Sequence, residues 1–339
     1  MNRYDRQIQL DEVGPMGQDK LRNAKVLIVG VGGLGCPAAL YLVGAGVGKI
    51  GLMDHDKVDL TNLHRQVLFQ ESDVGKPKAR AAKEHLSARN SNVVFEVIKE
   101  ALTVSNALSI FKNYDIILDG TDNFETKYLI NDACVLSNKP WIYASIYKNE
   151  GQLSVFNYKN GPSYRCLFPK TTRQNISCEA TGVLGVLPGI LGTLQAAEAL
   201  KLILERGEVL SGKLKLFNIM LGTEQTINIK KRPEEIEAIQ QNGILPIKIE
   251  CALKNEQQWY LDVREIFEQP KPKGNNVIHI PLGDILSRYR EIPEDIEVLV
   301  FCQSGKRSKK AVDLLKREFG FNNLKNVEGG IESIIEVEK

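Results

Sequence analysis

A glycine-rich turn directly follows the apolar run VLIV near the start of the chain. In its sequence, GVGGLG, the glycines are Gly30, Gly32, Gly33 and Gly35, and the helical pattern PAALYLVGAG comes next. Glycines in this arrangement allow a tight turn and let backbone N–H groups approach a phosphate at a helix N-terminus. Asp54 ends the next strand, KIGLMD, where its carboxylate can accept hydrogen bonds from ribose hydroxyls. The set predicts a nucleotide site, although the turn alone could merely pack a strand against a helix.

A polar cluster follows that second strand. The segment DLTNLHRQ contains Asn62, Arg65 and Gln66, and Lys78 lies in the helical stretch PKARAAKEHLSARN. A dinucleotide pyrophosphate is commonly held by the helix terminus, whereas a triphosphate carries more charge and requires several fixed cations. Because Arg65 and Lys78 would supply those cations, the cluster favours ATP over NAD. Either residue taken singly could equally be an ordinary solvated charge.

A further acid, Asp122, follows the buried run YDIILDG. This position is at the carboxyl edge of the predicted sheet, where open α/β folds hold their ligands. Magnesium prefers one or two carboxylates together with phosphate oxygens, so a single aspartate is sufficient for it. Alternatively, Asp122 or Thr121 could cap the helix that starts at NFETK.

A second reactive loop occurs late in the chain, in VLVFCQSGKRSKKAVDLL. Cys302 ends an apolar strand, and a helix begins near Ser308. Successive backbone N–H groups and the helix dipole would point at the sulfur, lower its pKa and stabilise a persulfide. Lys306 and Arg307 add positive charge. Cys36 and Cys134, by contrast, lie in apolar helical runs and are expected to be small core residues.

The surrounding patterns predict the elements that position these residues. From Lys25 to about Lys230, apolar runs alternate with helical stretches, which indicates a Rossmann-like, doubly wound α/β sheet. The pairs WIYASIYKNEGQLSVFNY and KLKLFNIMLGTEQTINIK predict added antiparallel strands. We therefore expect a first domain at 1–230, a linker at 231–256 rich in charge, proline and glycine, and a small α/β domain at 257–339.

The charge composition gives no support for nucleic-acid or membrane binding. The 339 residues are 43% hydrophobic, and 44 basic against 42 acidic residues give a formal net charge of +2. No overall field therefore argues for nucleic-acid or membrane binding. The N-terminus, MNRYDRQIQL, lacks an export signal, so a cytoplasmic protein is expected. The six cysteines are scattered, which in a reducing compartment means thiols rather than disulfides.

Taken together, the motifs RYDRQI, GVGGLG, DHDKVDLTNLHRQ, VGKPKA, DGTDN and SCEATGVLGVLPG resemble the ThiF/MoeB/HesA family. These enzymes are bacterial relatives of ubiquitin-activating enzymes, and the resemblance covers about the first 230 residues. It implies that ATP and Mg²⁺ adenylate the C-terminal Gly-Gly carboxylate of a small ubiquitin-like sulfur carrier. Arg65 and Lys78 would then contact the phosphates, and Asp122 would bind magnesium. Arg6 would reach the triphosphate from the other subunit of a homodimer.

The resemblance also bears on three cysteines. Cys178, in NISCEATG, matches a family cysteine that can link covalently to the activated carrier in some members, while a spectator role stays open; the polar segment LFPKTTRQNISCEATG would be the mobile crossover loop. Many members hold a structural zinc with two C-x-x-C pairs. Here Ser163 replaces the first ligand, Cys166 remains, and the second pair is absent. No zinc is expected, and Cys251 is too isolated to complete a four-ligand site.

Residues 257–339 resemble a single rhodanese domain through YLDVRE, NVIHIPL, CQSGKRS and VEGGI. This resemblance implies sulfur transfer on Cys302 and a structural role for Asp262 and Arg264. Two positions depart from the rhodanese pattern: Gln303 stands where arginine is frequent, and Ile334 stands where tryptophan is expected. The first could alter the choice of sulfur donor, and the second affects packing. An inactive scaffold is the alternative.

The combined expectation is carrier adenylation followed by rhodanese-assisted formation of a carrier thiocarboxylate. The partners would be a carrier of the molybdopterin-synthase small-subunit or ThiS type and a sulfur donor such as a cysteine desulfurase. The pathway stays open between molybdopterin, thiamine, and tRNA or amino-acid thiolation. The alternatives are an NAD-dependent oxidoreductase, for which no hydride-transfer site is evident, and a non-catalytic carrier-binding scaffold.

Overall fold

The computed structural model describes residues 3–169, 182–244, 250–255, 257–265, 268 and 270–335. The chain forms two compact units, Met1–Pro246 and Ile247–Lys339. Each unit has its own sheet and its own cluster of buried apolar side chains.

An eight-stranded sheet forms the centre of the first unit, with strand order β3-β2-β1-β4-β5-β6-β7-β8. The strands are β1 (Lys25–Val29), β2 (Lys49–Met53), β3 (Val94–Ile98), β4 (Ile116–Asp119), β5 (Trp141–Tyr147), β6 (Glu150–Phe156), β7 (Lys213–Asn218) and β8 (Thr223–Asn228). Strands β1 to β5 pair in parallel, and β6, β7 and β8 extend the sheet in antiparallel fashion. The predicted doubly wound sheet with added antiparallel strands is confirmed.

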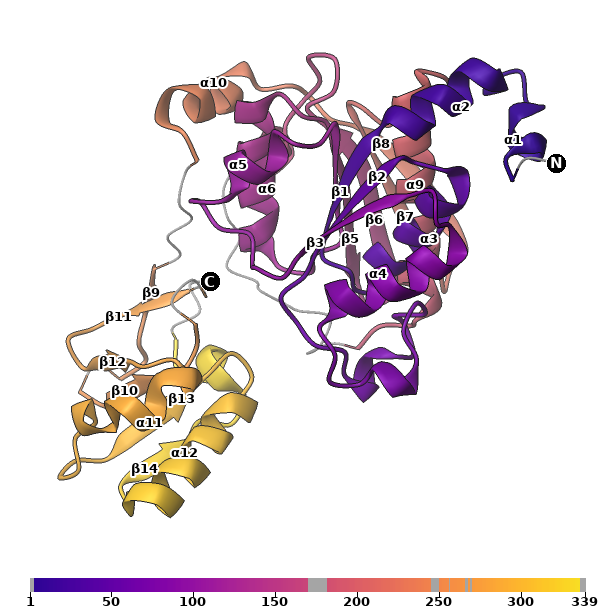
Figure 1. Ribbon diagram of the computed structural model, residues 1–339. Helices are drawn as coiled ribbons and strands as arrows, with labels where there is room; N and C mark the ends of the chain where they lie inside the picture. Colours follow the sequence, from indigo (N-terminus) through magenta and orange to yellow (C-terminus); the bar gives the residue numbers. More distant parts are fainter. Residues whose placement is uncertain are drawn as a thin grey trace. The chain divides into compact units, whose positions relative to one another are not determined.

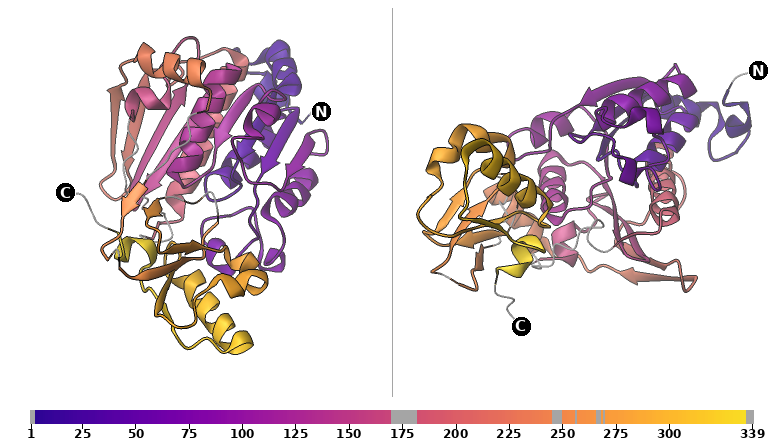
Figure 2. Two further views of the ribbon diagram at one scale, coloured as in Figure 1. Left: turned by 90° about the vertical axis from the view of Figure 1, so that its left-hand side faces the viewer. Right: turned by 90° about the horizontal axis from the view of Figure 1, so that it is seen from below.

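Helices cover both faces of this sheet (Figures 1 and 2). One face carries α3 (Gly35–Ala45), α4 (Lys78–Arg89) and α9 (Val186–Leu204), and the other carries α5 (Ala107–Phe111) and α6 (Phe124–Ser137). The remaining helices are α1 (Asp5–Ile8), α2 (Gly14–Asn23), α7 (Tyr164–Leu167) and α10 (Pro233–Asn242). The strand order reverses between β1 and β4, and the carboxyl edge at the loops after these two strands, called the crevice below, is where open α/β folds bind ligands.

Helix α9 is a core helix. Among the described residues it is the one helix long and apolar enough to cross a membrane, with 19 residues and a mean hydropathy of 1.3 in its most apolar window. Gln195, Glu198 and Lys201 interrupt its apolar sequence. It packs against α3, β5 and β6, and half of that window is buried inside the unit. Its apolar character therefore reflects packing between the sheet and α3.

The second unit contains a parallel four-stranded sheet with order β12-β10-β13-β14. Its strands are β10 (Trp259–Asp262), β12 (Val277–His279), β13 (Val298–Phe301) and β14 (Leu324–Asn326), and β9 (Glu250–Ala252) pairs separately with β11 (Lys271–Lys273). The helices α11 (Ile285–Arg288) and α12 (Lys306–Phe319) contact each other, and α12 packs on β13 and β14. The expected small α/β fold is confirmed.

Residues 231–256, expected to be a linker, contain regular elements. Helix α10 packs against α6 and α7 of the first unit, and Ile239 is fully buried. Strand β9 belongs to the second unit. The assignment of 231–256 as a linker stays a prediction.

Candidate functional site

The glycine loop is forced by close backbone contacts. Gly30 follows β1 with a φ of +89°, and a Cβ there would lie 2.8 Å from the carbonyl carbon of Gly120. A Cβ on Gly35 would lie 2.1 Å from the Gly30 oxygen, and one on Gly33 would press on Pro188. Gly30 and Gly35 are therefore required by the fold, whereas a side chain at position 33 would need Pro188 to shift by a few tenths of an ångström. Gly32 differs, since the nearest atom to its Cβ position is Gln66 Nε2 at an ordinary 3.6 Å.

Asp54 ties the glycine loop to the end of β2. Its Oδ2 accepts a hydrogen bond of 2.8 Å from the backbone N–H of Val31, and its Oδ1 accepts one of 2.9 Å from that of Asp56. The residue is only 8% exposed, and burial raises the pKa of its carboxyl group, against the nearby charge of Lys78. Each carboxylate oxygen retains a lone pair, so Asp54 could still accept hydrogen bonds from ribose hydroxyls.

Lys78, at the first position of α4, stands among three carboxylates. Its Nζ donates to Asp56 Oδ2 at 3.0 Å, and its side chain is only 8% exposed. Burial alone would lower the pKa of Lys78, but the charges of Asp54, Asp56 and Asp122 outweigh it and raise the pKa. Lys78 is therefore a fixed, protonated cation beside the glycine loop, with Asp122 within its electrostatic reach.

Arg65 leaves most of its guanidinium available. It follows the 3₁₀ turn Leu60–Asn62, and the Asn62 carbonyl accepts the backbone N–H groups of both Arg65 and Gln66. Its Nη1 donates to the Thr61 carbonyl at 3.2 Å, and within the described part of the chain it forms no ion pair. The buried Oε1 of Gln66 has no hydrogen-bond partner among the described residues. This cluster therefore has unused polar groups beside Gly32.

Asp122 is exposed, in the loop after β4. The cap of α6 is Asn123, whose Oδ1 accepts from the Thr126 backbone N–H at 2.8 Å, so the capping role considered for Asp122 and Thr121 belongs to their neighbour. Sequence reasoning missed the buried pair Asp119 and Lys127, which supports this loop. Its signal was a lysine and an aspartate inside otherwise buried segments.

Arg6 is not brought to the glycine loop within this chain. It is exposed in α1, and the next residue, Gln7, donates to the carbonyl of Ala45 at the C-terminal end of α3. The glycine loop lies at the other end of α3, about 16 Å away for a helix of 11 residues. Cys178 and most of the expected crossover loop lie outside the described residues.

At the position where many members of the family hold zinc, the Cys166 thiol makes hydrogen bonds instead. Cys166 is 3% exposed, and its Sγ accepts from the backbone N–H groups of Ser163 at 3.4 Å and Arg232 at 3.3 Å. Its thiol also lies 3.5 Å from the Arg232 carbonyl. One thiol and one hydroxyl do not supply the four ligands of a closed zinc site, so the residues do not fit the metal. Cys251 belongs to β9 of the second unit.

In the second unit, a loop closes around Cys302. The Sγ accepts from the Gly305 backbone N–H at 3.1 Å and from Ser308 Oγ at 3.4 Å. Burial alone would raise the pKa of the thiol, but the hydrogen bonds from Ser308 and from the backbone N–H groups of Ser304 and Gly305 outweigh it and lower the pKa. The loop therefore stabilises a thiolate at the start of α12.

Ionic contacts fix the surroundings of this loop. Arg307 pairs with Glu268 through two contacts of 2.6 Å, and Arg264 forms a buried bidentate pair with Asp262. The pKa of Arg307 is raised first by the hydrogen bonds that it donates to Glu268, and the charge of Cys302 also contributes. The structural role expected of Asp262 and Arg264 fits their burial. Ser308 and Glu268 are contacts that the sequence motif alone did not identify.

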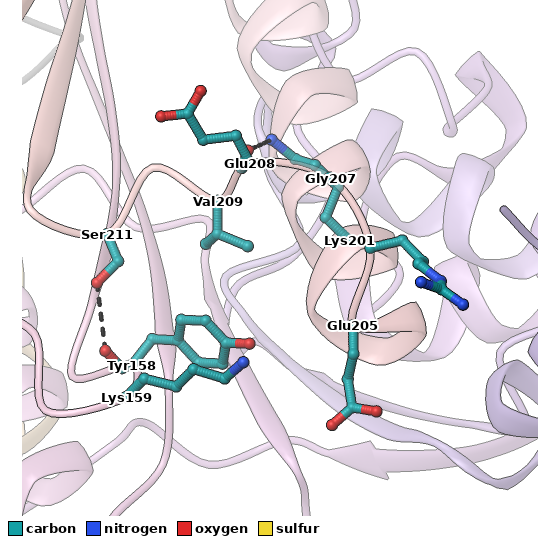
Figure 3. Close-up of a pocket in the computed structure, with 9 residues that line it drawn as sticks. Tyr158, Lys159, Lys201, Glu205, Gly207, Glu208, Val209 and Ser211 are labelled. Atoms are coloured by element: carbon teal, nitrogen blue, oxygen red, sulfur yellow. Dashed lines mark hydrogen bonds between the residues drawn. The ribbon is translucent and has the colours of Figure 1, made fainter.

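A separate cavity of about 370 Å³ lies at the opposite edge of the first sheet, and Figure 3 draws the residues that line it. Tyr158 lines it just beyond the end of β6, and that end pairs with the start of β5. Its polar groups are largely satisfied, because Lys201 donates to the Glu208 carbonyl and Ser211 to the Tyr158 carbonyl. The cavity is therefore remote from the glycine loop and is not the candidate site.

Comparison with known proteins agrees with both regions. Residues 4–238 match the ThiF family, and residues 251–336 match the rhodanese-like domain. The adenylyltransferase and sulfurtransferase MOCS3 of Culex quinquefasciatus is 38% identical over 98% of this chain and 86% of its own length. The sulfur carrier protein adenylyltransferase of Thermus thermophilus is 45% identical over 69% of this chain and 89% of its own.

Solved structures extend the comparison to the fold. The crystal structure of E. coli MccB with ATP is 29% identical, with a TM-score of 0.60, and the match covers 68% of this chain and 73% of that one. The match spans a length that corresponds to the first unit. Since the family region takes in well over half of the residues, this chain belongs to the ThiF family, and a rhodanese-like domain follows within the same chain.

Proposed function

We propose that this protein adenylates the C-terminal Gly-Gly carboxylate of a small ubiquitin-like sulfur carrier and then assists transfer of sulfur to it. The observation that carries the proposal is Lys78, held as a buried cation between Asp54, Asp56 and Asp122 at the crevice of the first sheet. The relatives named as adenylyltransferases support it. ATP use follows from membership of this adenylyltransferase family.

Each residue of the crevice has a part in holding the nucleotide. Gly32 leaves space for close approach of a phosphate, and the N-terminus of α3 favours negative charge. Asp54 accepts from the ribose, while Asn62 and Gln66 supply polar contacts. Arg65 and Lys78 neutralise phosphate charge. Because the carrier carboxylate is itself the nucleophile, positioning and charge neutralisation are sufficient, and no catalytic base is required.

Asp122 would hold Mg²⁺ together with phosphate oxygens. Its exposed carboxylate has no hydrogen bond among the described residues and lies at the crevice edge, which fits one carboxylate ligand of a magnesium ion. The ion would neutralise charge that develops on the pyrophosphate leaving group. Lys78 would share that task.

A surface beside the crevice fits the carrier. Leu184, Val186 and Ile190 are 50%, 54% and 42% exposed at the start of α9. A Cβ on Gly185 would lie 2.2 Å from the carbonyl oxygen of His64, so this segment abuts the residue before Arg65. A carrier resting on these apolar side chains would have its C-terminus near the phosphates. Val186→Glu should therefore raise the KM for carrier about tenfold and leave that for ATP unchanged.

The second unit would supply the sulfur. A donor such as a cysteine desulfurase would leave a sulfane sulfur on Cys302 as a persulfide, stabilised by the loop N–H groups. Its terminal sulfur would attack the acyl-adenylate, forming a C–S bond and releasing AMP. A second thiol then cleaves the resulting acyl disulfide and releases the thiocarboxylate; Cys178 is the candidate. The disulfide so formed requires an external thiol as reductant.

The decisive experiment is ATP–pyrophosphate exchange with candidate carriers that end in Gly-Gly. Asp122→Ala should abolish exchange, whereas Cys302→Ala should leave it within about twofold of wild type. No exchange with any carrier, together with tight NAD binding, would replace the proposal with the oxidoreductase. A scaffold function is not favoured, because Arg65, Lys78 and Asp122 are all present.

A homodimer is part of the proposal. Arg6 lies far from the glycine loop of its own chain, so it would contact the triphosphate bound by the other subunit. Arg6→Ala and Asp122→Ala should each be inactive alone. Mixing the two variants after partial denaturation should restore about a quarter of wild-type exchange, because one site of each mixed dimer is intact. Failure to restore exchange in verified mixed dimers would reject a role for Arg6 across the interface. A cytoplasmic location and the absence of zinc likewise stay proposals.

A further inference from the structure

The loop that carries Asp122 is held from one side by the glycine loop. The Gly120 backbone N–H donates to the Val29 carbonyl at 2.7 Å, and a Cβ on Gly120 would lie 2.1 Å from the Gly30 oxygen. The two loops therefore touch through backbone atoms. Any shift of the residues before Asp122 would also move them relative to the predicted phosphate site.

From the other side, the same loop is held by a single ammonium group. Lys127, in α6, is 1% exposed, and its Nζ donates to Asp119 Oδ2 at 2.7 Å, to the Ala144 carbonyl at 2.8 Å and to the Thr121 carbonyl at 3.0 Å. A lysine has three N–H donors, and all three are used here. Lys127 thus connects Thr121 with β4 and β5, and Thr121 immediately precedes Asp122.

Asp119 completes the hold on Thr121. Its Oδ1 accepts from the Thr121 backbone N–H at 2.8 Å and from its hydroxyl at 2.6 Å. The backbone carbonyl of Asp119 also accepts from Gln195 Nε2 in α9 at 2.7 Å. The N–H, hydroxyl and carbonyl of Thr121 are thus all bonded to the Asp119–Lys127 pair.

Another buried ion pair in the same unit provides a contrast. Arg165 forms two hydrogen bonds of 2.8 Å with Asp132, and this pair joins α7 to α6. Neither bond involves the loop at 120–122. Burying ions is costly, and replacing such a pair by apolar residues is often neutral for stability. Stability alone therefore does not explain the buried Asp119–Lys127 pair. Its hydrogen bonds to Thr121 indicate a role in loop geometry, and the Arg165–Asp132 pair has no such bonds.

We propose that Lys127 is a positioning residue that, through Thr121, holds the Asp122 carboxylate where the magnesium–triphosphate complex binds. The proposal rests on the adenylation function proposed above. It assigns Lys127 no contact with substrate or metal. Its effect is to keep a short, exposed acidic loop in one conformation, so that the carboxylate does not have to be ordered when the nucleotide arrives.

The test compares matched charge-neutral variants of the two pairs. Lys127→Met alone leaves Asp119 buried without its partner and could prevent folding, so Asp119→Asn/Lys127→Met is made beside it. The control is Asp132→Asn/Arg165→Met. For the first double variant we expect the Mg²⁺ concentration for half-maximal exchange to rise about tenfold, and hydrogen–deuterium exchange at residues 120–124 to accelerate. The control should change neither quantity, even if its melting temperature falls equally.

Coupling to Asp122 separates positioning from general damage. In the Asp122→Ala background, where exchange is abolished, binding of Mg²⁺–ATP is measured instead, and adding the Asp119→Asn/Lys127→Met change should weaken it less than about twofold, since no carboxylate remains to be positioned. An unchanged Mg²⁺ requirement, or an equal loss of Mg²⁺–ATP binding in both backgrounds, overturns the proposal. If the wild-type protein shows no exchange at all, the proposed function fails. Hydrogen–deuterium exchange still tests the positioning role in that case.

Discussion

The glycine-loop crevice and the Cys302 loop share one local arrangement, a loop between a parallel strand and a helix, but they differ in size. Both follow a parallel strand and open a helix; the Cys302 loop directs backbone N–H groups at a sulfur, and the glycine loop would direct them at a phosphate. The Cys302 loop closes on one sulfur with groups from consecutive residues, 302–308. The crevice collects Asp54, Lys78 and Asp122 from three separate segments of the chain.

The difference corresponds to the size and charge of what each site would hold. One sulfur atom is enclosed by a single short loop, and its charge is small enough for N–H groups and one hydroxyl. A triphosphate is long enough to contact several residues, and its charge requires fixed cations in addition to N–H groups. The crevice therefore depends on the packing of the whole first unit, whereas the Cys302 loop depends on local geometry.

Cys302→Ser is expected to have the largest effect, and it should separate the activities of the two sites. It should lower sulfurtransferase activity at least about 1,000-fold, because the hydroxyl cannot carry sulfane sulfur, and should leave ATP–pyrophosphate exchange nearly unchanged. Both activities are measured on the same preparation. A parallel loss of exchange would show that the two sites are not independent.

A matched pair of glycine variants should separate the sites next. Gly35→Ala places a Cβ 2.1 Å from the Gly30 oxygen, and Gly330→Ala places one 2.3 Å from the Gln303 oxygen. We expect the first to lower exchange about 100-fold and spare sulfur transfer, and the second to do the reverse. Circular dichroism checks that each variant is folded. If either variant impairs both activities equally, the contrast between the units fails.

Ser308→Ala should have a moderate effect confined to the second unit. Its hydroxyl lowers the pKa of Cys302, so its removal should raise that pKa and shift the alkylation-rate profile of the thiol to higher pH. The alkylation rate at neutral pH should fall about threefold, because less thiolate is present. Ser304→Ala is the control, since Ser304 contributes through its backbone N–H. An unmoved profile would assign the lowered pKa to the backbone alone.

The smallest effect is expected from metal removal. Because the Cys166 thiol is bonded to the backbone of Arg232, a chelator should change the melting temperature by less than about 1 °C, and metal analysis should find no zinc. Cys166→Ser should lower the stability by about 1 kcal/mol, since the shorter side chain loses these contacts. Stoichiometric zinc, lost together with stability on chelation, would contradict this interpretation.

The sequence by itself determined the doubly wound sheet and the residue types of both sites. Strand periodicity and the glycine spacing act locally, so the positions of Gly30, Gly35 and the loop after Cys302 could be predicted from the sequence alone. The antiparallel extension was likewise evident from the turn residues between strand-like runs. Asn123 as the cap of α6 was missed, although its neighbours Thr121 and Asp122 were considered.

Only the tertiary structure decided how distant segments meet. Lys127 could not be recognised as a support of the Asp122 loop, because its partners include Ala144 on a neighbouring strand. The sulfur contact between Cys166 and Arg232 likewise joins residues far apart in the chain. Such contacts depend on strand order and helix packing, which the periodicity of any one segment does not specify. Local spacing thus determined the chemistry available, and packing decided which groups act on one another.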